Sequence, residues 1–263
     1  MRLMKTQLLR HARRYEHTKN LSPISDLDDD LVAAFYRLDG GFSARDDICD
    51  AKPSSSRLGL HYLDTQFEIP ESFIDISEAR NYLESIQFLV CPTLARDLAS
   101  ATFASSGSPV TMDETARNMY TTLSSQLHQW HSAFDRLLSG SDNPNGIHSV
   151  AAATLRVRAI SSEVVIERVC PMNSESIDLL SSRSRELVDL SRFVANDPAF
   201  MKSFVWDCGI IPGLACVIAA CFDMSTRKEA LGILKDVVPR REGVWDSVTA
   251  VAFGERYLEV SGD

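Results

Sequence analysis

The chain has 263 residues, 44% of them hydrophobic and 24% charged, a composition that excludes a fully disordered protein and predicts a single domain over residues 1–263. Its formal net charge of −9 opposes contact with phosphates, so we expect no direct nucleic-acid binding. No apolar run reaches the ~18 residues of a membrane span, and residues 1–20 lack the apolar stretch of a secretory signal. We therefore expect no membrane partner and a location in the nucleus or cytoplasm.

The first third of the chain is predicted to hold helices on either side of an irregular segment. Residues 3–18 form a basic amphipathic helix, and residues 28–39 form a helix that begins with an aspartate run. Residues 42–75 are rich in proline and serine and are predicted to be irregular. Ser77 is the expected N-cap of a helix to about residue 103, which Pro92 should kink.

A capping box predicts where the next helix begins. Thr111 is followed three residues later by Glu114, and the helix should run to about Leu138. Apolar residues then recur at spacings of three and four, which indicates one buried stripe: Met119, Leu123, Leu127, Trp130, Phe134 and Leu137.

Helices with short connections are predicted through the rest of the chain, over residues 147–169, 174–195, 210–222, 226–237 and 246–260. Three of them have apolar residues expected to face inward: Val150, Ala153, Val157, Ile160 and Val164; Ile177, Leu180, Leu187, Leu190 and Val194; and Val248, Val251, Ala252 and Leu258. No alternation with a period of two is sustained. The predicted fold is all-α, a multi-helix bundle of antiparallel helices without a substantial sheet.

Candidate catalytic and metal-binding residues are few. His128, His131 and Asp135 share one helix face, but the sequence offers no further ligand at matching spacing, so we interpret them as a polar edge. Glu163 and Glu167 share a helix with arginines and are predicted to form a charged surface face. The sequence has no GxSxG, GxGxxG or GxxxxGK[ST] motif, and we predict no catalytic residue, no cofactor and no enzyme activity.

The six cysteines do not form a metal-binding pattern. They contain no CxxC pair, which a zinc cluster needs to bring its thiolates together. We expect them to be buried free thiols.

The block Pro239–Asp246 is typical of a joint between two helices. Pro239 ends one helix, and Arg240 and Arg241 are expected near its carbonyl end. Gly243 allows a turn, and Asp246 is the predicted N-cap of the last helix. Within the same block, Trp245 should pack against the first turns of that helix.

An earlier block, Trp206–Pro212, precedes the apolar helix over 210–222, and Asp207 is its predicted cap. Together the two blocks contain Asp207, Gly209, Ile210, Ile211 and Pro212, and Pro239, Arg240, Arg241, Glu242, Gly243, Trp245 and Asp246. In this order they resemble the end of the helical regulatory region of fungal zinc binuclear-cluster transcription factors. The similarity is strongest over residues 110–263 and looser upstream. One departure is Gly213-Leu214, where the family often has a second proline and an aromatic residue.

The resemblance implies a module for transcription regulation, often of secondary metabolism, that senses a small-molecule effector. The six-cysteine cluster and its basic linker are absent from this sequence, so zinc is expected only if an upstream cluster exists. No DNA-binding or catalytic role transfers to any residue, and the residues of the two blocks are expected to be structural.

Two alternatives remain open. The helical scaffold could serve a small-molecule-binding enzyme, with a pocket lined by Trp130, Trp206 or Trp245. The chain could instead be a dominant-negative partner, forming a homodimer, or a heterodimer with related factors, through an exposed apolar face.

Overall fold

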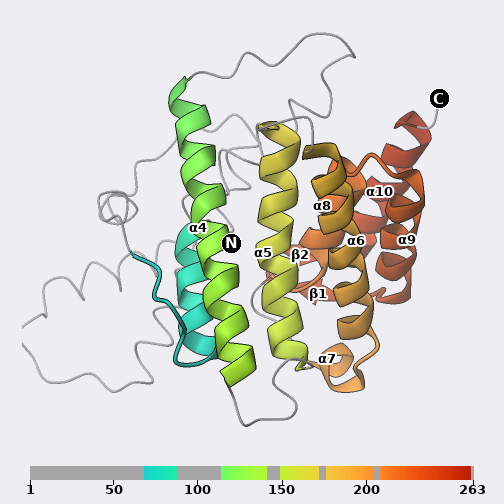
Figure 1. The fold of residues 1–263 in the computed structure, drawn as a ribbon. Helices are drawn as coiled ribbons and strands as arrows, with labels where there is room; N and C mark the ends of the chain where they lie inside the picture. Colours follow the sequence, from blue (N-terminus) through green and yellow to red (C-terminus); the bar gives the residue numbers. More distant parts are fainter. Residues whose placement is uncertain (1–67, 88–113, 141–148, 172–175, 204–207, 262–263) are drawn as a thin grey trace, which may run out of the picture. The chain divides into compact units, whose positions relative to one another are not determined.

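The computed structural model describes residues 68–87, 114–140, 149–171, 176–203 and 208–261 (Figure 1). These residues all belong to one compact unit, Leu38–Asp263. The predicted helices over 3–18 and 28–39, most of the irregular segment, Pro92 and Thr111 lie outside the described residues.

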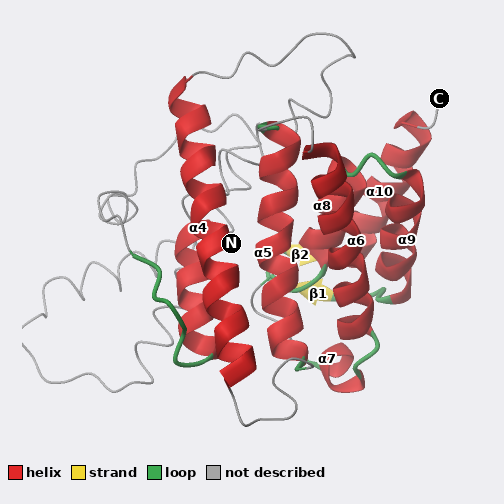
Figure 2. Cartoon of the chain, in the orientation of Figure 1, coloured by secondary structure: helices red, strands yellow, loops and turns green. Residues whose placement is uncertain are grey.

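Helices account for most of the described chain, which confirms the all-α prediction (Figure 2). Residues 76–87 are helical, and α4 (Glu114–Gly140), α5 (Val150–Val169) and α6 (Ser176–Ala195) follow in alternating directions (Figure 1). The next helices are α7 (Pro198–Lys202), α8 (Ile211–Ala220), α9 (Met224–Asp236) and α10 (Ser247–Ser261). An antiparallel hairpin, which the sequence did not predict, joins α9 to α10 through β1 (Arg241–Glu242) and β2 (Trp245–Asp246). None of the helices described is long and apolar enough to cross a membrane.

Two carboxylates cap the start of the helix over residues 76–87. The Asp75 carboxylate accepts a hydrogen bond from the Glu78 amide at 2.8 Å, and the Glu78 carboxylate accepts one from the Ile74 amide at 2.6 Å. The prediction that Ser77 is the N-cap was therefore wrong. Asp75 takes that role because a glutamate follows it three residues later, whereas Ser77 already lies in the first turn.

Helix α5 is the central element because both of its sides are buried. Val157, Ile160 and Val164 belong to a cluster formed with α6, α8, α9 and α10. Leu155 and Ile166 belong to a second cluster, which α5 forms with α4 and the helix over 76–87. The predicted inner stripe of α5 is confirmed, but it describes only one of the two packed sides.

The inward faces predicted for α4 and α6 are largely confirmed. On α4 the stripe from Leu123 to Phe134 is buried, and Met119 and Leu137 pack partly buried against the same cluster. On α6, Leu180, Leu187 and Val194 are buried, but Ile177 in the first turn is exposed.

The face predicted for α10 was wrong at two of its four positions. Val248 and Ala252 are exposed, and the residues that face inward include Ala250 and Gly254. The hairpin that leads into α10 fixes how the helix is rotated about its axis. Small residues such as Ala250 and Gly254 add little to a hydrophobic pattern even where they face inward. Sequence periodicity therefore could not identify the inward face of this helix.

Trp130 attaches the helix over 76–87 to α4. Its side chain is fully buried, and its indole N–H donates to the Ala79 carbonyl at 2.7 Å. The ring stacks on Phe134, with 4.6 Å between ring centroids. One tryptophan thus satisfies a buried carbonyl on a neighbouring helix and fills the second cluster.

We predict that Trp130→Phe lowers the free energy of unfolding by about 2–4 kcal/mol, because it leaves the buried Ala79 carbonyl without a donor and opens a small cavity. Urea denaturation followed by circular dichroism measures this. Trp245→Phe is the matched control, because Trp245 is 40% exposed, and it should change stability by less than about 0.5 kcal/mol. Equal effects of the two substitutions would contradict the role of Trp130.

Charged side chains connect α6 to α9 at the surface. The Glu229 carboxylate pairs with the guanidinium groups of Arg185 and Arg192. The hydrogen bond from Arg192, followed by the charges of both arginines, lowers the pKa of Glu229 below its ordinary value. A carboxyl whose folded-state pKa is lowered stabilises the fold above its unfolded pKa and loses that contribution as pH falls through the folded pKa.

Replacing Glu229 by Gln should therefore lower stability above pH ~5, and the difference from wild type should shrink as the pH falls toward ~3. Thermal unfolding across this pH range provides the measurement. Glu259→Gln, in an exposed pair on α10, is the control. A Glu229→Gln difference that stays constant from pH 3 to pH 7 would disprove this role.

Candidate functional site

The carboxylate of Glu242 caps helix α8 from a distant part of the chain. Its side chain is 0% exposed, and its Oε2 accepts hydrogen bonds from the amides of Gly209 and Ile211 at 3.0 and 2.9 Å. Ile211 is the first residue of α8, whose N-cap residue Ile210 makes no side-chain cap. Glu242 thus supplies both the hydrogen-bond acceptor and the negative charge that a helix N-terminus favours.

Arg240 neutralises this buried carboxylate. Its Nε donates to Glu242 Oε1 at 2.8 Å, and its side chain is only 4% exposed. The Arg240 backbone is also tied to α10, because its amide donates to Ser247 Oγ and its carbonyl accepts from the Ser247 amide, both at 2.9 Å. We call Gly209, Arg240, Glu242 and Ser247 the joint, since they connect the start of α8 to the start of α10.

Two glycines are required by the geometry of this joint. Gly243, in the turn of the hairpin, has φ of 56°, a conformation that side-chain-bearing residues rarely adopt. At Gly209 an added Cβ would lie 2.5 Å from Glu242 Oε1, so any side chain there would displace the carboxylate.

The structure brings several of the predicted block residues together and leaves others apart. Asp246 caps α10 as predicted, accepting from the Thr249 amide at 2.8 Å. The expectation that Arg240 lies at the carbonyl end of the preceding helix was wrong, because the buried Glu242 pairs with it instead. At the surface lie Pro239, Arg241 and Trp245, while Pro212 is half-buried in the first turn of α8. Asp207 lies outside the described residues.

The joint reaches helix α7 through Phe200. The Arg240 Nη1 donates to the Phe200 carbonyl at 2.9 Å, and the guanidinium carbon lies 3.8 Å from the centroid of the Phe200 ring. Asp197 caps α7 by accepting from the Phe200 amide at 2.6 Å. Phe200 is thereby held from both ends of its backbone and on its ring.

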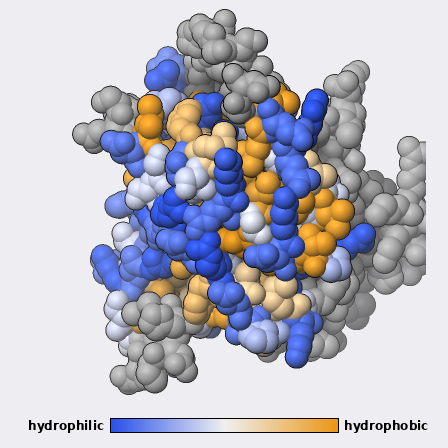
Figure 3. All heavy atoms as spheres, turned by 90° about the vertical axis from the view of Figure 1, so that its right-hand side faces the viewer, coloured by the Kyte–Doolittle hydropathy of each residue, from blue (hydrophilic) through white to orange (hydrophobic). Residues whose placement is uncertain are grey.

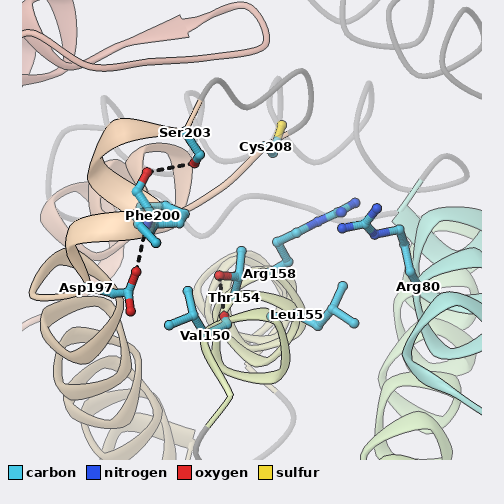
Figure 4. A pocket seen from close by; sticks show the side chains of 11 residues that line it. Arg80, Val150, Thr154, Leu155, Arg158, Asp197, Phe200, Ser203 and Cys208 are labelled. Atoms are coloured by element: carbon cyan, nitrogen blue, oxygen red, sulfur yellow. Dashed lines mark hydrogen bonds between the residues drawn. The ribbon is translucent and has the colours of Figure 1, made fainter.

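A cavity of about 500 Å³ lies beside Phe200, between α5, α7 and the helix over 76–87 (Figure 4). Its walls are largely apolar, with arginines from two helices and several polar groups among them. The described residues that line it are Arg80, Val150, Ala151, Thr154, Leu155, Arg158, Asp197, Ala199, Phe200, Ser203 and Cys208.

The guanidinium groups of Arg80 and Arg158 point toward one another from two helices (Figure 4). Arg158 is buried, pairs with Glu84 at 3.6 Å and donates to Gln87 at 2.8 Å. Arg80 has a buried Nε that finds no partner in the described part of the chain. Sequence reasoning missed both residues, although an arginine between buried apolar residues of α5 is itself a signal of a buried polar site.

Two of the sequence candidates, His131 and Glu163, lie in a polar cluster between α4, α5 and α6. His131 is buried 3.3 Å from Glu163, which also pairs with Arg183 at 3.2 Å, while His128 is exposed. The Glu163 side chain is only 15% exposed, so its prediction as part of a surface face was wrong, because α6 covers it with Arg183. Within the described ranges no three metal-ligand side chains gather.

The prediction of buried cysteines is confirmed for two of the four that the structure describes. Cys170 and Cys221 are buried, and Cys208 and Cys216 are half-buried. Burial raises the pKa of Cys170, which lowers the fraction of reactive thiolate.

Contrary to what the enzyme alternative expected, the tryptophans in the described part of the chain do not line the cavity. Trp130 is buried in the second cluster and Trp245 is at the surface, and neither lines the cavity, while Trp206 lies outside the described residues. Exposed hydrophobic side chains of α10 include Val248, Phe253 and Val260. On the face of the molecule shown in Figure 3, hydrophobic side chains gather in patches between hydrophilic ones.

Comparison with known proteins gives no relative from which a role could be transferred. No protein-family model, curated protein or solved structure matches the chain.

We predict that Glu242→Gln lowers the free energy of unfolding by about 3–5 kcal/mol, since it leaves the buried Arg240 guanidinium without a counter-charge. Chemical denaturation measures the effect. The control is Glu259→Gln, in the exposed pair of Arg256 and Glu259, which should lower the free energy of unfolding by less than about 1 kcal/mol. A loss for Glu242→Gln that is no larger than this control would refute the proposed ion pair.

Contact between Gly209 and Glu242 is tested by a double-mutant cycle. Gly209→Ala should destabilise the wild type by about 1–3 kcal/mol through steric displacement of the carboxylate. In a Glu242→Ala background the same substitution should cost much less, because the obstructing atoms are gone. Additive losses would show that the two residues do not interact.

Proposed function

We propose that this chain is an effector-sensing regulatory module of the type found in fungal zinc-cluster transcription factors. In this proposal it acts in the nucleus on transcription and relies on another polypeptide segment for DNA contact. A small molecule bound in the cavity beside Phe200 changes how α8 and α10 are held by the joint.

One observation carries the proposal: Phe200 belongs to the cavity wall and contacts Arg240 of the joint. A ligand in the cavity would contact α7 at Phe200. Phe200 is bonded to Arg240, Arg240 is paired with Glu242, and Glu242 caps α8. Binding energy realised at the cavity can therefore bias the positions of two helices that lie farther along the chain.

The resemblance noted in the sequence gains support from the same contacts. Arg240, Glu242 and Gly209 come from the two blocks that carry the resemblance, and they meet in one buried joint. Residues that specify a shared joint are expected to recur together in related proteins, even where the surrounding helices differ.

The enzyme alternative finds less support in the described residues. Among the described residues of the cavity wall, the hydroxyls of Thr154 and Ser203 and the carboxylate of Asp197 are bonded to backbone groups rather than to one another. A cavity that holds a ligand without reacting with it suits a sensor.

A reporter experiment tests the regulatory function. The full chain is fused to a heterologous DNA-binding domain in yeast, and reporter output is compared with that of the DNA-binding domain alone. We expect output to differ by at least about fivefold in at least one of several carbon or nitrogen sources. Matched output in every medium, at equal protein levels and with the fusion folded, would contradict the proposal.

A further inference from the structure

We infer that the cavity beside Phe200 binds a small organic anion, with the anionic group held by Arg80 and Arg158 and the apolar body packed against Phe200, Val150 and Leu155. Binding of such an anion follows from the cavity alone. Its action as the effector of the module rests on the proposed function.

Charge is the first argument for an anionic ligand. Arg80 and Arg158 line the same cavity and point toward one another, with Glu84 near Arg158 as the partner carboxylate. The guanidinium of Arg80 forms no ion pair among the described residues, and its Nε is buried. Arg158 pairs with Glu84, and the Asp197 carboxylate of the same wall accepts from the Phe200 amide. The charge of Arg80 is therefore the one without a carboxylate partner in the described part of the wall, and an anion beside it is favoured.

The other polar groups around the cavity are already engaged. The Thr154 hydroxyl donates to the Val150 carbonyl at 2.7 Å, and the Ser203 hydroxyl donates to the Phe200 carbonyl at 2.7 Å. Asp197 accepts from the Phe200 amide. These bonds leave the guanidinium of Arg80 as the group in this wall best placed to bind a charged ligand.

Size and surface define the rest of the ligand. A volume of about 500 Å³ falls within the ~300–1,000 Å³ range of small-molecule sites. The aliphatic and aromatic side chains of the wall, Val150, Leu155 and Phe200 among them, favour an apolar body. A carboxylate on an aromatic or aliphatic body of about ten to fifteen heavy atoms matches both properties.

Isothermal titration calorimetry on the purified full chain tests the inference with two probes that differ in charge, 1-naphthoate and 1-naphthamide. We expect 1-naphthoate to bind at least about tenfold more tightly, because a charge-assisted hydrogen bond is lost with the amide. Absence of binding by either probe, or equal affinity for both, would overturn the inference.

Two cavity variants locate the site, and one variant serves as control. Arg80→Met keeps the length of the side chain, removes its charge and should abolish the preference for 1-naphthoate. Ala151→Phe, which fills the cavity without removing a charge, should weaken binding of both probes. Arg256→Met on α10 should leave both affinities unchanged, since Arg256 is paired with Glu259 away from the cavity. Preference retained in Arg80→Met, or unweakened binding in Ala151→Phe, would reject the site, and the second variant decides if the first does not fold.

The two proposals fail in different ways. If naphthoate shows no preference while the reporter fusion still responds, the ligand assignment is wrong and the regulatory function stands. If naphthoate binds as expected while the reporter never responds, the cavity is an anion site in a protein with another function.

Discussion

The buried ion pair between Arg240 and Glu242 is the interaction on which the second half of the structure depends. An uncompensated carboxylate with 0% exposure would be strongly destabilising, but Glu242 receives two backbone amides and one guanidinium N–H. The same contacts fix three helix ends, at α7, α8 and α10. Arg240 and Glu242 therefore determine together how the starts of α8 and α10 and the end of α7 meet.

Helix α5 gives the joint a rigid frame. It separates two hydrophobic clusters. One is formed with α4 and the helix over 76–87, which precede α5 in the chain, and the other with helices that follow α5. The cavity lies where α5 meets α7 and the helix over 76–87. Its wall therefore contains residues from a helix that precedes α5 and from one that follows it. A ligand in this position would contact α5 on one side and Phe200, which is bonded to Arg240 of the joint, on the other.

Much of the helical pattern could be predicted from the sequence, because amphipathic spacing and capping residues are local signals. The stripe of α4 and the Asp246 cap are examples. The joint itself could not be derived from local signals, since Glu242 finds its partners thirty-one and thirty-three residues away. Arg80 and Arg158 were missed for the same reason, because only the packing of two helices brings their side chains to one cavity.

Hydrogen exchange at the amides of Gly209 and Ile211 tests the central claim most directly. Amides in the first turn of a helix and just before it ordinarily lack an internal partner and exchange quickly. If Glu242 caps α8, these two amides exchange as slowly as amides in the middle of α5 and α8. Exchange at the rate of exposed, unbonded amides would contradict the joint, and with it the connection between the cavity and the last helices.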